Sequence, residues 1–405
     1  MKILFLTDNF IPETNAPAYR TYEHCREWIK QGEEVTVITC FPNFPYGEVY
    51  EGYKNKLYQV EHIEGIRVVR VWSFMAENKG FVKRILDFLS YMCSSFIAGL
   101  FIKTDLIIAT SPQFFTAVSG RWLAFWKRKR WVMEVRDLWP ESIKVVGAMK
   151  DNWAIRFFEY LEHKLYKSAW KIVTATAYIR NTIIEKHNLP SNKIKVIRNG
   201  VDLNHFKPLP KDNSLTSKLK LENKFVIGYI GTHGMAHALD FILKAASKIE
   251  NQKVHFLFVG SGAVKNDLLR LNKNLGLKNT TFIDSVTKAE VKRYISILDM
   301  GLVNLIDSPV FLGAIPSKMN ELVAMKKPIL LGVKGEAKAF VTENDLGLTF
   351  TPEDERSFIE AIDKAFHESA DFEIDIERVK PIIDRELLAL QMLQFIKTEN
   401  EIDSE

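Results

Sequence analysis

Two glycine-rich turns in the second half of the chain each follow a short apolar run. The first turn holds Gly231, Thr232, His233, Gly234 and His237, and the second holds Gly260 and Gly262. Glycine lets the backbone come close to an anion, and the free N–H groups at the start of a helix attract phosphate. His233 and His237 add donors, but no third metal ligand stands near them in sequence, which disfavours zinc. These turns predict phosphate-binding loops.

A third segment of this kind lies at the start of a later helical pattern. Ser317 is expected to cap that helix, Lys318 to lie at its positive end, and Glu321 to lie one turn further on. A lysine there can hold a diphosphate, and a carboxylate one turn on can hold ribose hydroxyls. The alternative is a surface lysine and glutamate beside an ordinary helix start. The sequence has no Asp-x-Asp, so a metal–diphosphate clamp of that type is missing.

Polar residues also follow apolar runs in the first half. The loop at 8–20 carries Asn15, Ala16 and Pro17 before a helical pattern, with Arg20 in its first turn. It is predicted to meet an anion at the helix start, and the alternative is an ordinary strand–helix loop. Arg136 and Asp137 follow the run at 131–135. Arg136 could bind phosphate and Asp137 sugar hydroxyls, or both could form a structural salt-bridge corner.

Apolar runs and helical patterns alternate along the chain, which predicts parallel sheets covered by helices on both faces. Strands are expected at 2–7, 34–39, 66–72, 106–110, 131–135, 172–176 and 195–197, and again at 225–230, 255–259, 281–283, 301–303, 328–331 and 347–350. The rhythm restarts after an aperiodic stretch at 208–224. The fold class is therefore α/β, with two Rossmann-like doubly wound domains at 1–207 and 208–383. Ligands of such sheets bind beyond the carboxyl ends of the strands.

Composition favours a globular chain in a reducing compartment. Of 405 residues, 47% are hydrophobic and 26% are charged. Cys25, Cys40 and Cys93 are odd in number and widely spaced, which argues against a disulfide framework and fits the cytoplasm. The apolar run at 3–6 is too short for a secretion signal and predicts a buried strand. Residues 1–200 hold 29 Lys and Arg against 20 Asp and Glu, and the remainder hold 26 against 30. The two halves are thus expected to meet different partners.

Two segments of the basic half could meet a membrane. Residues 85–102 are mostly apolar with basic flanks, and they fit a core helix, a helix in the membrane surface, or a span. Further along, aromatic and cationic side chains alternate at Trp122, Trp126, Lys127, Arg128, Lys129 and Arg130. Such a mixture suits a lipid headgroup layer. A solvated helix end is the alternative, and nucleic acid is disfavoured.

Taken in order, these segments resemble family 4 of the retaining glycosyltransferases, which have the GT-B fold. The resemblance rests on RNGVDLNHF at 198–206, FVGSG at 258–262, Asp299, and IPSK at 315–318 followed by Glu321. A narrower resemblance, to the L-fucosamine transferases of O-antigen and capsule assembly, is carried by NAPAYRTYEH, TCFPNFPYGEVYEGYKNK, ATSPQFF, RDLWPES and GYIGTHGMAHAL.

The resemblance implies a division of labour. The second domain would bind a nucleotide-sugar donor, expected to be UDP-linked, and Glu321 would hold its ribose. The first domain would bind a saccharide on undecaprenyl diphosphate, and a final helix at 384–405 would pack back on it. Gly313 stands where the family has the first of two glutamates, and Thr232 and His237 stand where many members have Arg and Lys. Lys318, His233, His237 and backbone N–H groups would then meet the diphosphate.

The same resemblance implies transfer with retention, no protein nucleophile, no cofactor and no metal. Stabilisation of the leaving diphosphate would dominate, with Lys318, Arg136 and Asp137 as the catalytic candidates. The enzyme would lie on the inner face of the cytoplasmic membrane. A sugar-nucleotide epimerase or hydrolase of similar fold remains an alternative. So does an inactive membrane-bound scaffold, for which Gly313 is the supporting feature.

Overall fold

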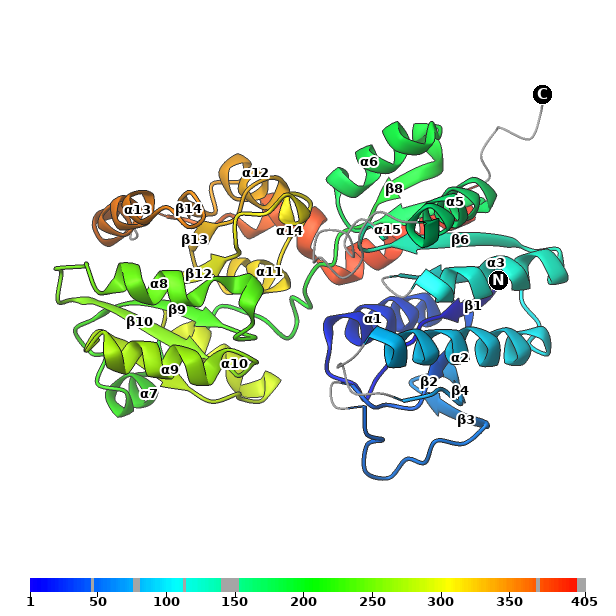
Figure 1. Cartoon of the computed structure of the whole chain (residues 1–405), viewed down its shortest axis with the longest axis horizontal. Coiled ribbons are helices and arrows are strands. Elements are labelled where there is room, and N and C mark those ends of the chain that lie inside the picture. The colour runs from blue at the N-terminus through cyan, green and yellow to red at the C-terminus, as the bar shows by residue number, and fades with distance from the viewer. Residues whose placement is uncertain (45–46, 76–80, 112–113, 140–152, 369–371, 399–405) are drawn as a thin grey trace. The chain divides into compact units, whose positions relative to one another are not determined.

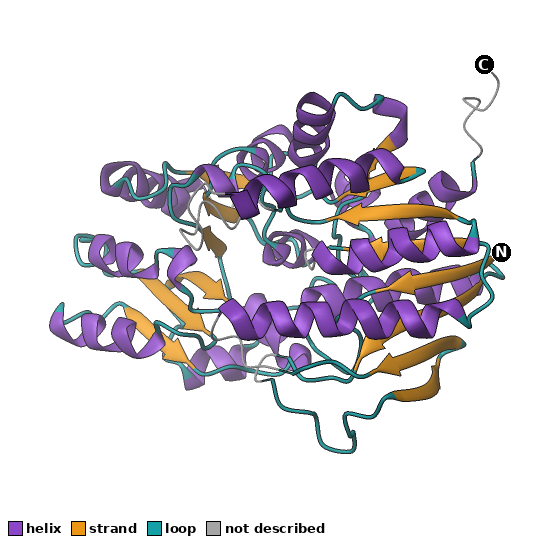
Figure 2. Cartoon of the chain, turned by 45° about the vertical axis from the view of Figure 1, so that its right-hand side comes forward, coloured by secondary structure: helices purple, strands orange, loops and turns teal. Residues whose placement is uncertain are grey.

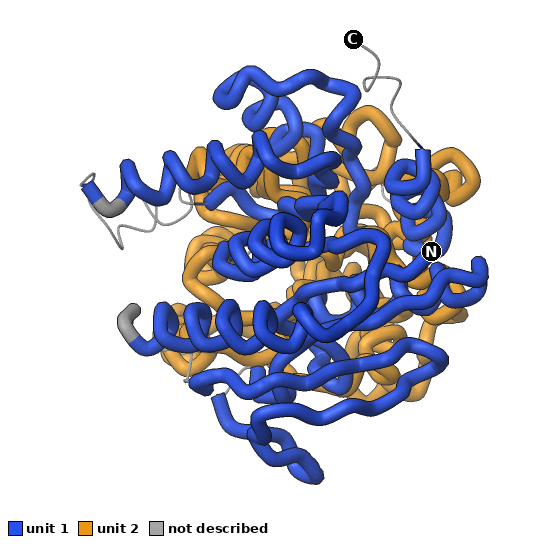
Figure 3. The backbone as a smooth tube through the Cα atoms, turned by 90° about the vertical axis from the view of Figure 1, so that its right-hand side faces the viewer, with its two compact units in different colours: residues 1–199, 385–405 blue, residues 200–384 orange. Residues whose placement is uncertain are grey.

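The computed structural model describes the chain except residues 45–46, 76–80, 112–113, 140–152, 369–371 and 399–405 (Figure 1). The chain divides into two compact units (Figure 3), and each unit has its own sheet. Unit 1 comprises Met1–Asn199 and Arg385–Glu405, and unit 2 comprises Gly200–Asp384. Each unit is an α/β domain with helices on both faces of its sheet (Figure 2), which confirms the predicted fold class.

Unit 1 is built on a mostly parallel sheet in the order β3-β4-β2-β1-β5-β6-β7-β8. Its strands are β1 (Lys2–Leu6), β2 (Glu34–Cys40), β3 (Tyr58–Ile63), β4 (Ile66–Val71), β5 (Leu106–Thr110), β6 (Arg130–Val135), β7 (Lys171–Thr174) and β8 (Ile194–Val196). Edge strand β3 pairs antiparallel with β4 and was not predicted. Its residues alternate between exposed and half-buried, so it forms no continuous apolar run.

Six described helices cover this sheet. They are α1 (Ala16–Lys30), α2 (Phe81–Leu100), α3 (Phe114–Lys127), α5 (Trp153–Ser168), α6 (Ala177–His187) and α15 (Arg385–Lys397). Helix α1 begins at Ala16, because the side chain of Asn15 accepts a hydrogen bond from Ala18 N and Pro17 fits the first turn.

Helix α15 ends the described chain but belongs to unit 1. The indole of Trp28 on α1 donates to Ala389 O at 2.9 Å, and Leu388 and Met392 join the core on that face of the sheet. The predicted helix at 384–405 therefore packs on the first domain, although residues 399–405 lie outside the described part. The predicted domain boundary at 207 is too late, because Val201 N donates to Ile383 O within unit 2.

Unit 2 is built on a parallel sheet in the order β11-β10-β9-β12-β13-β14. Its strands are β9 (Phe225–Ile230), β10 (Val254–Val259), β11 (Thr280–Ile283), β12 (Met300–Asn304), β13 (Ile329–Gly332) and β14 (Gly347–Thr349). Its described helices are α7 (Asn213–Lys218), α8 (Leu239–Ala246), α9 (Lys265–Asn274), α10 (Lys288–Ser296), α11 (Ser317–Ala324), α12 (Glu336–Glu343), α13 (Glu355–Glu368) and α14 (Ile376–Ile383).

The strand order reverses once in each sheet, and that reversal decides where a ligand can bind. In unit 1 the chain moves from β1 to β2 on one side and later places β5 on the other side of β1. In unit 2 strand β9 likewise separates β10 from β12. Each unit therefore has one topological switch point, and in doubly wound folds ligands bind beyond the carboxyl ends of the strands at that point.

Candidate functional site

The two glycine-rich loops of unit 2 pack against each other through their backbones. His233 N donates to Ser261 O at 2.9 Å. A Cβ atom on Gly260 would lie 2.0 Å from Gly231 O, and one on Gly262 would lie 2.4 Å from His233 O. Gly260 also has a φ of 143°, which side chains disfavour. These glycines therefore let the two loops meet, a role that the sequence did not reveal.

A buried lysine fixes the second of these loops. Lys265 Nζ donates to Gly260 O at 2.7 Å, to Ile283 O at 3.0 Å and to Asp284 Oδ1 at 2.6 Å. The amine thereby uses its three donors within the protein. The sequence patterns alone did not identify Lys265. The signal for it was a lysine at the first position of the helix that follows a glycine-rich turn.

The amine of Lys318 lies on the aromatic ring of Tyr229 at the switch point of unit 2. Its Nζ is 3.6 Å from the ring centroid, and Tyr229 Oη donates to Thr232 O at 2.7 Å. A Cβ on Gly231 would lie 3.0 Å from this Nζ. Among the described residues the buried Nζ has no hydrogen-bond partner. Burial lowers the pKa of Lys318 to about 7, and the charge of Glu321 opposes that shift.

Two histidines flank the same ring. The rings of His233 and His237 lie 5.8 Å and 5.6 Å from that of Tyr229. His233 is fully buried, and neither of its ring nitrogens has a partner within the described part of the chain. Burial and then nearby cations lower the pKa of each histidine to about 4. Both are therefore neutral at pH 7. We call Tyr229, His233, His237 and Lys318 the unit 2 centre.

Asn304 ties this centre to strand β12 and was also missed by sequence analysis. Its Nδ2 donates to His237 O at 3.0 Å, and Nδ1 of His237 lies 3.4 Å from Asn304 O. Asn304 is a polar residue that ends a buried strand at the switch point. That position after an apolar run could have identified it.

Helix α11 presents Lys318 and Glu321, but it starts differently from the prediction. The residue at its N-cap is Pro316, and Ser317 is the first helical residue, without a side-chain cap bond. The prediction that Ser317 caps α11 is therefore wrong, because proline precedes it at the cap position. Gly234 occupies the N-cap of a short 3₁₀ turn at Met235–His237, and Thr232 is exposed.

In unit 1, Arg20 lies fully buried beside the switch point. Its Nε donates to Glu134 Oε1 at 2.9 Å, and its two terminal nitrogens donate to the carbonyls of Ile197 and Arg198. All three nitrogens thus hold the protein together. Every guanidinium nitrogen of Arg20 is thus already engaged within unit 1, and Asn15, Ala16 and Pro17 form the start of α1. The assignment of these four residues to an acceptor-binding loop stays a prediction.

Arg136 differs from Arg20 although both lie near Glu134. Its Nε and Nη1 are buried and have no hydrogen-bond partner in the described segments, while its backbone N donates to Ser111 Oγ at 3.2 Å. Burial lowers the pKa of Arg136. The charge of Glu134 opposes this shift, and the charge of Arg20 adds to it. Asp137 is exposed. Residues 140–142 of the RDLWPES motif lie outside the described residues. We call Arg20, Glu134 and Arg136 the unit 1 centre.

The apolar segment at 85–102 forms most of α2, which packs in the core of unit 1. Tyr91 and Met92 are buried, whereas Ile97 and Phe101 are exposed. In the portion of the chain that the structure describes, no helix has both the length and the apolar character that crossing a bilayer requires.

Exposed aromatic and basic residues gather at the ends of α2 and α3. Phe125 is 79% exposed and Trp126 is 69% exposed, and Lys127 Nζ donates to Leu100 O. We define the basic aromatic patch as Trp122, Phe125, Trp126, Lys127, Arg128, Lys129 and Arg130. Arg130 begins β6, whereas Arg136 follows its end. The patch and the unit 1 centre therefore lie at opposite ends of the strands of this sheet.

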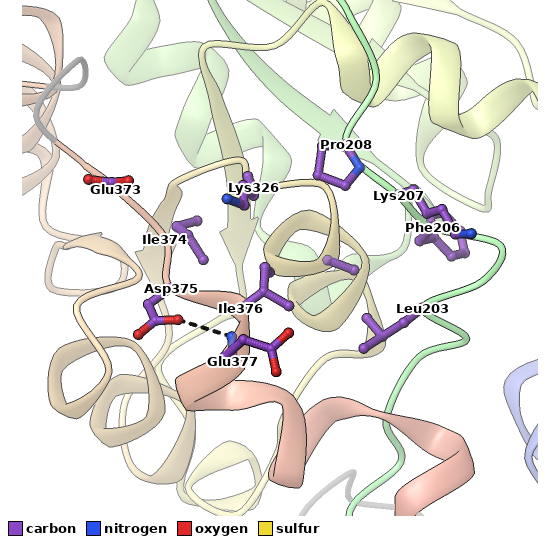
Figure 4. Close-up of a pocket in the computed structure, with 11 residues that line it drawn as sticks. Leu203, Phe206, Lys207, Pro208, Lys326, Glu373, Ile374, Asp375, Ile376 and Glu377 are labelled. Atoms are coloured by element: carbon purple, nitrogen blue, oxygen red, sulfur yellow. Dashed lines mark hydrogen bonds between the residues drawn. The ribbon is translucent and has the colours of Figure 1, made fainter.

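A pocket of about 640 Å³ lies elsewhere in unit 2 (Figure 4). It is lined by Lys207, Lys326, Glu373 and Glu377 among others, and by none of the predicted donor-binding residues. Asp375 in its wall accepts from Glu377 N as the cap of α14. The described residues include no group of three or more His, Cys, Asp or Glu arranged to hold a metal.

Two family models match the chain in order. The model described as Glycosyltransferase Family 4 matches residues 18–205, and the model described as Glycosyl transferases group 1 matches residues 224–368. With the two Rossmann-like units, these matches define the chain as a glycosyltransferase of the GT-B fold. It belongs to glycosyltransferase family 4.

Relatives and solved structures agree with this class. WcaI of Escherichia coli K12, named as a colanic acid biosynthesis glycosyl transferase, is 29% identical over 70% of this chain and 71% of its own. WbjE of Pseudomonas aeruginosa, named as a glycosyltransferase, is 25% identical over 58% of this chain and 59% of its own. Anabaena HepE in complex with UDP and glucose has a TM-score of 0.71 at 15% identity, covering 98% of this chain and 99% of its own. Sucrose-phosphate synthase of Thermosynechococcus elongatus has a TM-score of 0.74 at 16% sequence identity, covering 98% of this chain and 98% of its own.

Proposed function

We propose that this enzyme transfers a sugar from a nucleotide donor, expected to be UDP-linked, to a saccharide on undecaprenyl diphosphate during bacterial surface-polysaccharide assembly. The observation that carries the proposal is the buried amine of Lys318 at the switch point of unit 2, which lies on the ring of Tyr229 and has no hydrogen-bond partner among the described residues. A relative named for colanic acid biosynthesis supports the pathway class, and a similar fold with bound UDP supports the nucleotide. N-acetyl-L-fucosamine is the sugar we favour, for O-antigen or capsule.

In this proposal the unit 2 centre receives the diphosphate. Lys318 supplies the positive charge, the backbone N–H groups of Thr232 and Gly234 donate to the phosphate oxygens, and Glu321 holds the ribose. Because charge builds on the diphosphate as the glycosidic bond breaks, a fixed cation there lowers the barrier most. No cofactor or metal takes part, and the absence of a glutamate at Gly313 leaves more of this task to Lys318.

Unit 1 would receive the acceptor. Nε and Nη1 of Arg136 have no hydrogen-bond partner among the described residues, and the guanidinium fits a phosphate oxygen of the acceptor, while exposed Asp137 can accept from a sugar hydroxyl. The basic aromatic patch would hold the enzyme on the inner face of the cytoplasmic membrane.

The test is a transfer assay with a panel of UDP-sugars and a short-chain lipid-diphosphate sugar. Formation of an extended lipid-linked saccharide from one donor is the expected result. Sugar release or inversion without acceptor would favour an epimerase or hydrolase. Donor binding without any turnover would favour an inactive scaffold.

The membrane contact has its own test. Each Lys or Arg near an anionic surface contributes about 1 kcal/mol, screened by salt. Replacing Lys127, Arg128, Lys129 and Arg130 with Gln should release the protein from anionic vesicles and leave donor binding unchanged. Because the patch lies at the opposite end of the strands from Arg136, transfer to a water-soluble acceptor should also survive. Equal vesicle binding by the variant and the wild type would remove the patch as the membrane contact.

A further inference from the structure

Lys318 occupies a position that is unfavourable for a permanent positive charge. An ammonium has three N–H donors, and the buried Nζ finds no acceptor among the described residues. The face of Tyr229 attracts a cation, but one ring does not replace the water that burial removes. A neutral amine avoids most of that cost. In the absence of ligand, the site therefore holds an amine that can readily lose its proton.

The groups around Lys318 offer little compensation. Tyr229 stays neutral because burial raises its pKa, and His233 and His237 stay neutral at pH 7. Lys265 on α9 is engaged by Asp284 and two carbonyls. Glu321 on α11 is the acid whose charge favours the ammonium. An arriving diphosphate would bring more negative charge to Lys318 than the site itself provides.

We propose that the donor diphosphate binds the unit 2 centre together with a proton, which Lys318 takes up as the anion approaches its amine. This inference rests on the proposed function, because it assumes that a nucleotide sugar binds here. The diphosphate of a nucleotide sugar is esterified at both ends and has no proton to lose near neutral pH. The proton therefore comes from solvent, the amine becomes an ammonium, and no other bond changes.

The direction of the pH dependence follows from this linkage. The anion raises the pKa of Lys318 in the complex above its value of about 7 in the free protein. Well below pH 7 the ammonium is present with or without donor, so donor affinity does not change with pH through this group. Above pH 7 the free protein loses the proton that the complex keeps. Donor affinity should then fall about tenfold per pH unit.

The experiment is titration calorimetry of the full-length protein with UDP-glucose, and with UDP as a second probe. At pH 8 both probes are fully ionised, since a terminal phosphate titrates near pH ~6. Titrations in HEPES and in Tris at pH 8, and in MES and in Bis-Tris at pH 6, report the number of protons taken up, because the ionisation enthalpies within each pair of buffers differ. We expect close to one proton per UDP-glucose at pH 8 and close to none at pH 6.

Three variants assign the proton to Lys318. Lys318→Arg keeps its charge throughout this range, so binding should involve no proton and should be constant from pH 6 to pH 9. Lys318→Met should bind more weakly and take up no proton. Lys338→Met removes an exposed lysine of α12 and should behave as the wild type.

Two results would overturn the inference without touching the proposed function. One is a binding enthalpy of the wild type that is the same in both buffers at pH 8. The other is proton uptake that persists in Lys318→Met, which would assign the proton to another group such as His233. A folded protein that binds neither UDP nor UDP-glucose at any pH would instead contradict the proposed UDP-linked donor.

Discussion

Each Rossmann-like unit buries a cation at its switch point, but the two cations are used differently. In unit 1 every nitrogen of the Arg20 guanidinium donates to a carboxylate or a carbonyl. In unit 2 the amine of Lys318 is buried against Tyr229 and has no hydrogen-bond partner in the described structure. Arg20 therefore serves the fold, whereas Lys318 is available to a ligand. The comparison predicts opposite effects when each charge is removed.

Removing Arg20 should have the largest effect. Arg20→Met leaves Glu134 buried without its partner, and breaking such a pair costs about 3–5 kcal/mol of stability. All eight tryptophans lie before residue 200, so their fluorescence during urea unfolding reports on unit 1 alone. Lys2→Met, at the exposed ion pair with Glu34 in unit 1, is the control and should change stability by less than about 1 kcal/mol. A loss for Arg20→Met no larger than the control's would contradict the structural role.

Removing Lys318 should affect catalysis and leave the fold intact. Lys318→Met should lower kcat by about 10²–10³, the usual effect of deleting one group that stabilises a leaving anion. Donor affinity near neutral pH should fall by less than kcat does. The thermal midpoint should stay the same or rise, because the variant no longer buries an unpaired amine. A change in KM alone would make Lys318 a uniform binding group, and a lower midpoint would break the comparison with Arg20.

Removing the Glu321 carboxylate should have a smaller effect, which is confined to donor binding by unit 2. Glu321→Ala should weaken donor binding by about 1.5–3 kcal/mol, the range for hydrogen bonds to a charged group. Calorimetry with UDP measures this directly. Glu343→Ala, at an exposed position of α12, should leave affinity unchanged. Full affinity in a folded Glu321→Ala protein would remove the ribose assignment.

Asn15 should show the smallest effect, on unit 1 stability. Its side chain accepts from Ala18 N at 2.9 Å, and an N-cap of this kind contributes about 1 kcal/mol. Asn15→Ala should lower the free energy of unfolding by that amount, while Asn15→Ser or Asn15→Asp should retain most of it. If all three substitutions had equal effects, the cap would not be what stabilises the start of α1.

The fold class could be predicted from the sequence because the spacing of apolar residues that marks a strand or a helix involves only residues close together in the chain. Nearly every strand appears as a short apolar run between helical patterns, and strand β3 escaped because its alternating, half-exposed residues lie at the sheet edge. The α/β class and the glycosyltransferase class are confirmed.

The details of the site depend on contacts that are distant in sequence. From the sequence alone, Tyr229 is one more apolar residue of β9. In the structure the amine of Lys318 lies on its ring. Arg20 reads as a free cation, but its partners come from β6 and the 197–198 segment. Neighbouring residues do not encode which side chain a loop will meet. Roles based on position after a strand could therefore be predicted, whereas pairing between loops could not.

Helix α15 places the last described helix of the chain in the first unit. During synthesis, residues 1–199 leave the ribosome long before residues 385–397, so the core face that holds Trp28 stays uncovered until α15 has emerged. Unit 2 is one continuous segment that needs no later residues to complete its core, so it can finish folding first. The order of completion is thus the reverse of the order of the domains. A variant truncated after Asp384 would keep all residues of unit 2 and expose the apolar surface of unit 1 that α15 covers to aggregation or proteolysis.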